Sequence, residues 1–274
     1  MTPATEADRA EIIATLLPHA ERAMFPLNNL IHHGMGTDHP YAVTLWLRRD
    51  AGRITDVLTQ SAGGMVMPFL PSGDFAGAAR MLRARELAGI VGPRDWSRGL
   101  EAALRLTGRR SLDHDEPHFL LSLADLILPD GPGRIVPLAE APGEIIRAWM
   151  LDYQLATLGT PPDKAAARVA TSYARYLEAG SHVALIDGDT PLAMTGFNAQ
   201  VPGMVQVGGV YTPPDLRGRG HARRALALHL LATGAPRATL FSASAAAARA
   251  YRALGFRQIG DWTLMLLADT EKVG

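Results

Sequence analysis

The spacing of apolar residues along the chain changes repeatedly between a period near two and a period near 3.6. Apolar or alternating runs over residues 41–49 and 53–60, joined by an Asp-Ala-Gly turn, predict a β-hairpin. Residues 182–186 and 191–198 predict a second hairpin around an Asp-Gly-Asp turn. Residues 203–212 follow it as a third strand.

Helical spacing predominates between these strands. The first helix is expected to end at Pro26, because proline lacks the amide hydrogen that a helix interior needs. The expected helices cover residues 6–17, 76–85, 96–106, 142–158, 161–179, 221–231 and 244–254. The remaining strands are expected at residues 61–68, 88–91, 119–128, 134–138, 237–242 and 257–267. Strands and helices that alternate in this way indicate the α/β (α+β) class.

The glycine- and proline-rich segment 129–133 is the strongest candidate for a domain boundary. Both sides of it contain the order hairpin, strand, helix, strand, helix. Residues 63–68 can also be laid over 208–213, since both read Gly-Gly, three further residues and a proline. We therefore expect domains at 1–128 and 134–274, the first being a degenerate copy of the second. An unrelated α/β subdomain is the alternative.

Composition narrows the class of protein. The 274 residues are 47% hydrophobic and 20% charged, which is typical of a globular chain. Lys plus Arg and Asp plus Glu both number 27, so the net charge gives no basis for binding nucleic acid or an anionic membrane. The absence of cysteine excludes disulfides, thiolate metal ligands and a cysteine nucleophile. With neither a signal-like start nor an apolar run that could span a bilayer, we expect a soluble cytoplasmic protein.

Two histidine-containing segments hold residue types that bind metals. His114 and His118 flank Asp-Glu-Pro, but the proline favours an extended chain over a helix that would align the two rings. His32 and His33 are adjacent, so on a helix they would point in different directions. We expect a solvated linker in the first case, a capping or mobile role in the second, and a metal site in neither.

The densest chemical signal lies between the strand at 203–212 and the helix that begins near His221. Residues 212–222 read Thr-Pro-Pro-Asp-Leu-Arg-Gly-Arg-Gly-His-Ala and contain the spacing Arg-x-x-Gly-x-Ala. Glycines let backbone amides approach phosphate oxygens, and the first turn of a helix carries free N–H groups at a positive dipole end. Arg217 and Arg219 add charge that suits phosphate.

Two common nucleotide-binding motifs do not fit this loop. It lacks the Lys-Ser/Thr of a P-loop and the third Gly or Ala of a dinucleotide fingerprint. We therefore expect the loop to hold a pyrophosphate. An ordinary glycine-rich turn with solvated arginines is the alternative.

Together with a second motif, Ala-Tyr-Arg-Ala-Leu-Gly-Phe at 250–256, the loop resembles the GNAT acetyltransferase superfamily over roughly the second half of the chain. The resemblance implies a mixed, mostly antiparallel central sheet flanked by helices, in two tandem copies. It implies acetyl-CoA as co-substrate without a metal, and an amide N–H near Val210 that polarises the thioester carbonyl. It also implies that Tyr251 protonates the departing thiolate. The implied coenzyme A contacts are Val210, Tyr211, Thr212, Arg217, Gly218, Arg219, Gly220, His221, Ala222 and Ser244.

Two positions depart from the family's pattern. Ser244 stands where the family often has asparagine, and Gln206 where many members have a glutamate general base. The base is then a water or a carboxylate such as Asp152. The predicted function is acetyl transfer from acetyl-CoA to a primary amine by a monomer or homodimer, with neither nucleic acid nor membrane as partner. A small amine, an amino acid, an antibiotic and a peptide N-terminus all remain open as acceptors. The alternative function is an acyl-CoA-binding or protein-interaction module with little turnover.

Overall fold

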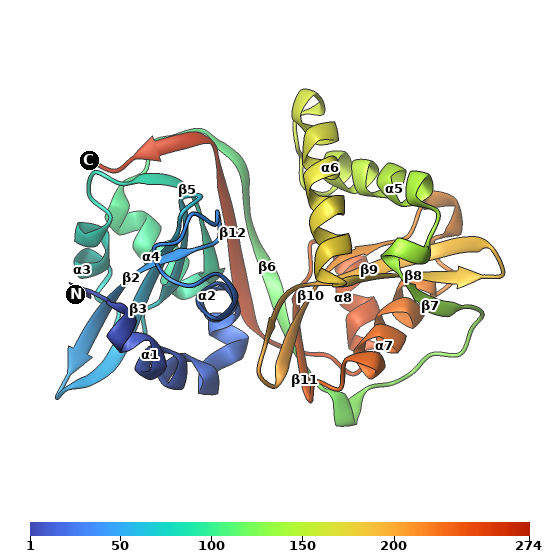
Figure 1. The fold of residues 1–274 in the computed structure, drawn as a ribbon, viewed down its shortest axis with the longest axis horizontal. Coiled ribbons are helices and arrows are strands. Elements are labelled where there is room, and N and C mark those ends of the chain that lie inside the picture. Colours follow the sequence, from blue (N-terminus) through green and yellow to red (C-terminus); the bar gives the residue numbers. More distant parts are fainter. The chain divides into compact units, whose positions relative to one another are not determined.

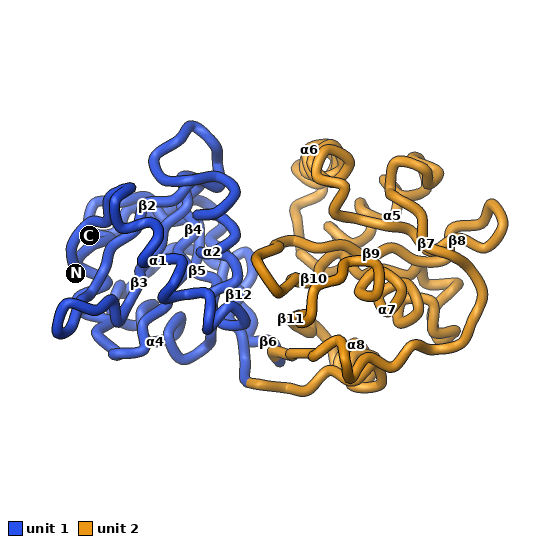
Figure 2. Tube along the Cα trace, turned by 60° about the horizontal axis from the view of Figure 1, so that its bottom comes forward, with its two compact units in different colours: residues 1–117, 260–274 blue, residues 118–259 orange.

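The computed structural model describes residues 1–274, and the chain divides into two compact units (Figures 1 and 2). Unit 1 comprises Met1–Pro117 and Gly260–Gly274, and unit 2 comprises His118–Ile259. The chain therefore passes between the units twice, whereas the sequence pattern suggested a single boundary at residues 129–133.

The end of the chain completes the sheet of unit 1. Strand β12 (Arg257–Lys272) pairs antiparallel with β5 (Glu86–Pro93), from Trp262 to Leu266 and again at its last two residues. The apolar pattern predicted a closing strand here but assigned it to the second half. The strand is present, yet the alternation of side chains along one strand does not reveal its partner.

Unit 1 is a sheet with the strand order β1-β2-β3-β4-β5-β12. Besides β5 and β12, its strands are β1 (Thr2–Pro3), β2 (Val43–Asp50), β3 (Arg53–Ser61) and β4 (Met65–Phe69). The hairpin and third strand expected from the sequence are present as β2, β3 and β4. The helices of this unit are α1 (Arg9–Leu16), α2 (Ala20–His33), α3 (Phe75–Met81) and α4 (Arg94–Leu104), with 3-10 turns at Glu6–Asp8 and Leu17–His19.

The sequence suggested that the first helical region ends at Pro26, but it does not. Helix α2 continues to His33, beyond the proline. Its backbone leaves helical geometry at Ala23, where φ is −122°, and resumes afterwards. Pro26 thus lies in the first turn after a kink, where its missing N–H has no intrahelical partner to lose.

Unit 2 is a mixed sheet with the strand order β6-β11-β10-β9-β8-β7. Every neighbouring pair is antiparallel except β10 and β11, which run parallel. The strands are β6 (Arg110–Ser122), β7 (Arg134–Pro137), β8 (His182–Asp187), β9 (Thr190–Val201), β10 (Met204–Tyr211) and β11 (Arg237–Phe241). Strand β6 belongs to unit 2 from His118 onward, and its earlier residues belong to unit 1. The helices are α5 (Gly143–Ala156), α6 (Pro162–Ala179), α7 (His221–Thr233) and α8 (Ala245–Arg252), and short 3-10 turns lie at Leu123–Asp125, Leu138–Glu140 and Pro214–Leu216. The mostly antiparallel sheet flanked by helices agrees with the predicted fold class.

The segment around His114 is a strand, not the solvated linker that we expected. Residues 110–122 form β6, and His118 pairs with Phe241 of β11. His118 is only 3% exposed, and its Nε2 lies 2.7 Å from the Thr239 hydroxyl oxygen. Pro117 is compatible with an extended strand, so the proline argument was correct about local conformation. The expected exposure to solvent holds at His114 and Asp115 but is wrong at His118.

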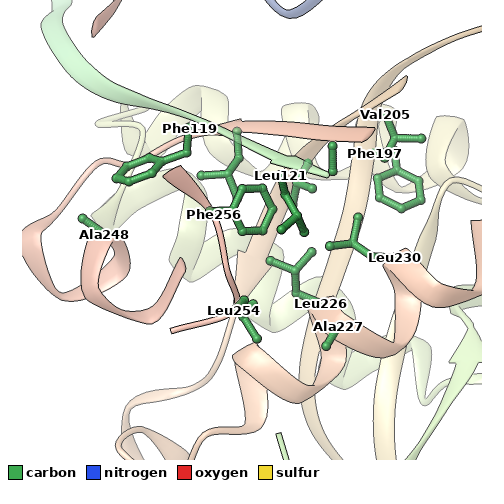
Figure 3. Packing of buried hydrophobic residues seen from close by; sticks show 13 residues of the cluster. Phe119, Leu121, Phe197, Val205, Leu226, Ala227, Leu230, Ala248, Leu254 and Phe256 are labelled. Carbon is green, nitrogen blue, oxygen red and sulfur yellow. The ribbon is translucent and has the colours of Figure 1, made fainter. Parts of the chain in front are cut away.

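Two apolar clusters hold the helices to opposite faces of the unit 2 sheet. Helices α5 and α6 lie on one side in both views, and α7 and α8 on the other (Figures 1 and 2). On the α7 side, Leu121, Leu226 and Phe256 converge in the buried cluster drawn in Figure 3. On the other side Trp149 of α5 and Met194 of β9 belong to a second buried cluster. Strand β10 contributes to both clusters, which fixes its position firmly.

None of the helices combines the length and the apolar character needed to cross a membrane.

Helix α6 ends at Gly180, whose φ of 57° is the left-handed conformation that glycine adopts without steric cost.

Candidate functional site

Strands β10 and β11 pair over a short stretch and then separate. The parallel register joins Met204–Gln206 to Arg237–Thr239, and no pairing with β11 follows along Val207–Tyr211. The second half of β10 is therefore held by β9 alone. Backbone groups on its other side are available to an extended ligand that adds itself like a strand.

A bulge distorts the same half of β10. Its register with β9 shifts between Gln206 and Val207 and again between Gly208 and Tyr211. Gly209 lies within the second shift and has a φ of +62°, which favours glycine. Bulges re-aim backbone groups, so the amides near Val210 point differently from those of a regular strand.

The loop after β10 leads into an uncapped helix. Gly220 occupies the N-cap position of α7 with a φ of 85°, and no side chain bonds the first-turn N–H groups. Gly218 has a φ of +79°, and an added Cβ there would meet no atom within 4 Å. The first turn of α7 therefore offers free amide donors beside open space, an arrangement that suits a phosphate group.

The two loop arginines are exposed and only loosely tethered. Arg217 Nε donates to the Thr212 carbonyl at 3.0 Å, and its guanidinium carbon lies 5.9 Å from the centre of the Tyr211 ring. Arg219 donates to the Asp215 carbonyl at 3.3 Å. Each arginine keeps further N–H donors for an anion.

Tyr211 and Asp152, predicted separately as a cofactor contact and a base, are brought together. The Tyr211 hydroxyl donates to Asp152 Oδ2, which links the end of β10 to α5. Burial, followed by this hydrogen bond, raises the pKa of Tyr211 to about 12. The phenol therefore stays protonated, and Asp152 is held at the end of the bulged strand.

Helix α8 presents the predicted thiolate acid. Tyr251 is half-buried, and its ring centre lies 6.4 Å from that of Phe119 and 6.0 Å from that of Phe256. Tyr251 and Val210 pack against the same apolar cluster. Helix α8 and the bulge of β10 are thus held by the same buried cluster.

Ser244 has a structural role here. It is the N-cap of α8, and its hydroxyl accepts from the Ala247 amide at 3.2 Å. This is the preferred use of serine at the start of a helix. The predicted contact between Ser244 and coenzyme A stays a prediction beside this observed cap.

Gln206, at the position of the missing glutamate, is 2% exposed. Its Nε2 donates to the Val207 carbonyl at 2.6 Å, while its Oε1 is buried without a hydrogen-bond partner. An amide of this kind cannot accept a proton at neutral pH. The only carboxylate that the predicted residues bring to this part of β10 is that of Asp152.

Sequence reasoning missed three side chains that shape this region. Arg224 of α7 donates to the carbonyls of Pro129 and Pro132 at 2.9 Å, so the segment 129–133 is fastened to the helix that follows the loop. His182 and His229 are buried, and each has one ring nitrogen without a hydrogen-bond partner. A charged residue in a helix and two histidines within apolar runs gave no motif that could have revealed these contacts.

Comparison with known proteins gives a consistent result. The family model described as the acetyltransferase (GNAT) family matches residues 143–256. No curated protein matches the sequence.

Several solved structures share the fold along most of the chain. A protein from Drosophila is 14% identical with a TM-score of 0.61, and 97% of each chain is covered. A tandem GNAT protein from the clavulanic acid biosynthesis pathway is 14% identical with a TM-score of 0.57, covering 98% of this chain and 97% of that one. A GCN5-related N-acetyltransferase from Sphaerobacter thermophilus is 15% identical with a TM-score of 0.54, covering 96% and 93%.

This fold supports acyl-CoA-dependent N-acetyl transfer in general. The diverging parallel strands, the bulge in β10 and the uncapped helix α7 all lie inside or beside the matched residues. Residues 143–256 of this chain are a domain of the GNAT acetyltransferase family.

Proposed function

We propose that unit 2 transfers the acetyl group of acetyl-CoA to a primary amine by direct attack of the amine on the thioester. The observation that carries this proposal is the uncapped N-terminus of α7, which follows, after a short loop, the half of β10 that β11 does not pair. An adenine nucleotide thioester has a long amide-containing arm and a diphosphate. The strand would bind the arm, and the N-terminus of the helix would bind the diphosphate.

Coenzyme A would be held mainly by the backbone. Its pantetheine amides would bond along Val210–Thr212 in the manner of an added strand. Its diphosphate would lie over residues 217–222, where the amides of His221 and Ala222 open the helix and two arginines supply positive charge.

The chemistry would then use three groups of this chain. The amide near Val210 would stabilise negative charge on the acyl oxygen, because a fixed donor costs no reorganisation during the reaction. Tyr251 would give its proton to the departing sulfur, since a phenol and a thiol have similar pKa values. Asp152, or a water beside it, would receive the proton that the attacking nitrogen loses.

Unit 1 would be a degenerate copy of the same fold. It repeats the parallel pairing, with Met65 and Val66 of β4 beside Gly89 and Ile90 of β5, but it has no Arg-x-x-Gly-x-Ala loop after β4. We propose a cytoplasmic protein that acts as a monomer or homodimer and needs no metal, nucleic acid or membrane.

The second candidate is an acyl-CoA-binding or protein-interaction module with little turnover. The buried amide of Gln206 at the position of the usual base favours it. The enzyme and the acyl-CoA-binding form of the module both require that coenzyme A binds to unit 2, so binding alone does not separate these two.

The deciding experiment is a thiol-release assay with acetyl-CoA and a broad panel of amines, run beside calorimetry of coenzyme A binding. The enzyme predicts amine-dependent release that falls in Tyr251→Phe while the Kd for coenzyme A is unchanged. Tight binding without release for any amine would select the module. Failure of coenzyme A to bind at all would refute the enzyme and the acyl-CoA-binding module, and only the protein-interaction module would be left.

A further inference from the structure

His182 is the most deeply buried titratable side chain beside the bulge of β10. It begins β8 and is 1% exposed. Its ring stacks on Tyr176 of α6, with ring centres 3.5 Å apart and an interplanar angle of 15°. The ring is therefore fixed in position by a helix on one side and by the sheet on the other.

Two glycines make room for this ring across the sheet. His182 pairs with Gly196 of β9, which in turn pairs with Gly208 of β10. A Cβ added to Gly196 would overlap the imidazole. A Cβ added to Gly209 would lie 3.0 Å from His182 Nε2. The ring thus extends from β8 beneath β9, and its Nε2 end reaches the bulge itself.

The two ring nitrogens have different surroundings. Nδ1 lies 2.9 Å from the Ser181 hydroxyl, whereas Nε2 is buried without a hydrogen-bond partner. A hydroxyl that donates to Nδ1 leaves the single proton of a neutral imidazole on Nε2. A buried donor that has no acceptor is costly, by about 1–3 kcal/mol. Such a group is therefore expected where a ligand supplies the acceptor.

The surroundings keep this imidazole neutral. Burial is the main reason that the pKa of His182 is lowered to about 3, and electrostatic repulsion from His229 and Arg175 adds to the effect. A neutral ring of this kind is a weak base at physiological pH, but it can donate a hydrogen bond without giving up its proton.

We propose that His182 donates its Nε2–H to the acyl carbonyl oxygen of the bound thioester, as a second donor beside the amide near Val210. This inference rests on the proposed function, which lays the thioester against the bulge. As the amine nitrogen bonds to the acyl carbon and the carbon–sulfur bond breaks, negative charge grows on that oxygen. The amine loses one proton and the sulfur gains one, so His182 keeps its own proton throughout. A fixed neutral donor of this type contributes on the order of 100-fold to the rate.

The test compares wild type with His182→Phe and His182→Gln in the full-length chain. Phenylalanine keeps an aromatic ring against Tyr176 but removes the donor, and glutamine carries an amide N–H near the position of Nε2. We expect kcat for amine acetylation to fall about 100-fold in His182→Phe and to recover partly in His182→Gln. The Kd for coenzyme A without an acyl group should be unchanged in both. If wild type acetylates an amine and His182→Phe is equally active, the inference is overturned while the proposed function stays intact.

A spectroscopic arm covers the case in which a variant fails to fold or no amine is found. In wild type labelled with ¹⁵N-histidine, the Nε2 resonance of His182 reports directly whether this nitrogen is protonated. The resonance is assigned by its loss in either variant that folds, or otherwise through its contacts with Tyr176. We expect a protonated Nε2 whose shift changes on adding acetyl-CoA and much less on adding coenzyme A. An unprotonated Nε2, or equal responses to the two ligands, would refute the donor role. Absence of binding by both ligands would instead refute the proposed function and the inference with it.

Discussion

Helices α3 and α7 occupy corresponding places in the two units, yet their N-termini are chemically opposite. Each follows a strand that runs parallel to the next strand along the chain, β4 beside β5 and β10 beside β11. In unit 1 the carboxylate of Asp74 caps α3 and accepts from the Gly77 amide at 2.9 Å. In unit 2 glycine stands at the cap of α7, and no side chain takes that role.

A second carboxylate reinforces the difference in unit 1. Asp56 is buried and accepts from the amide of Ser72 at 2.9 Å and from its hydroxyl. Arg48 balances both carboxylates, since its guanidinium lies 4.0 Å from Asp56 Oδ2 and 3.3 Å from Asp74 Oδ2. The loop of unit 1 has thus satisfied its donors internally, whereas the loop of unit 2 has left them open. The fold provides a helix N-terminus in both places, but the cap residue decides whether an anion can use it.

The strongest way to break this comparison is to give unit 2 the carboxylate that unit 1 has. We expect Gly220→Asp to weaken coenzyme A binding about 1,000-fold, because juxtaposed like charges cost several kcal/mol. Calorimetry with coenzyme A measures the change. Gly220→Asn is the matched control, since asparagine meets the same left-handed backbone without the charge. Equal affinities of the Asp and Asn variants would show that charge at this cap is irrelevant.

The next largest effect concerns acid stability, which should be governed by the buried histidines of unit 2. Burial lowers the pKa of His229 to about 4, from an ordinary value of 6.5. Between pH 6.5 and 4 the unfolded chain binds a proton at this histidine and the folded protein does not. The associated free energy of unfolding is therefore fully present above pH 6.5 and is lost as the pH falls toward 4. That contribution is about 3 kcal/mol for His229.

His229→Phe keeps an aromatic ring beside Phe197, whose ring centre lies 3.9 Å away, but removes the titration. Urea unfolding at pH 7 and at pH 5 should therefore give a smaller loss of free energy in the variant than in wild type. The same loss in both proteins would place the acid sensitivity in other groups.

Catalysis offers a third contrast, because only unit 2 has a tyrosine on the helix that follows the second parallel strand. Helix α8 contains Tyr251, whereas α4 of unit 1 has the sequence Arg-Asp-Trp-Ser-Arg-Gly-Leu-Glu-Ala-Ala-Leu. We expect Tyr251→Phe to lower kcat about 100-fold, the usual loss on removing a general acid. The Kd for coenzyme A should hold, since the ring and its packing against Phe119 and Phe256 remain. A matched fall in affinity with unchanged kcat would make Tyr251 a binding residue only.

The local secondary-structure elements and the glycine-rich loop could be predicted from the sequence, because both depend on short-range residue patterns. The period of the apolar residues predicted the hairpins and most helices, and the glycines at 218 and 220 predicted the open helix N-terminus that is observed. Partners across the sheet were harder to predict. Nothing in residues 257–267 indicated that the strand pairs with β5 of unit 1.

The sequence motifs led to the predicted site residues, whereas contacts that arise only from packing were missed. The bond between Tyr211 and Asp152 joins residues 59 positions apart and has no sequence signature. His182 became visible only because Gly196 and Gly209 leave space for its ring. Ser244 was interpreted through a family pattern, while its observed hydrogen bond is a helix cap, which its position before an alanine-rich helix could have indicated.

The smallest expected effect probes unit 1 itself. Asp74→Ala removes the cap of α3 and should lower the free energy of unfolding by about 1 kcal/mol, whereas Asp74→Asn, which can still accept from the Gly77 amide, should lower it less. Neither variant should change coenzyme A binding, because α3 has only seven residues and Asp56 remains beside its loop. Urea unfolding and calorimetry measure the two quantities. A gain of a second coenzyme A site in Asp74→Ala would mean that this one carboxylate prevents binding in unit 1, and unit 1 would then be one substitution away from binding.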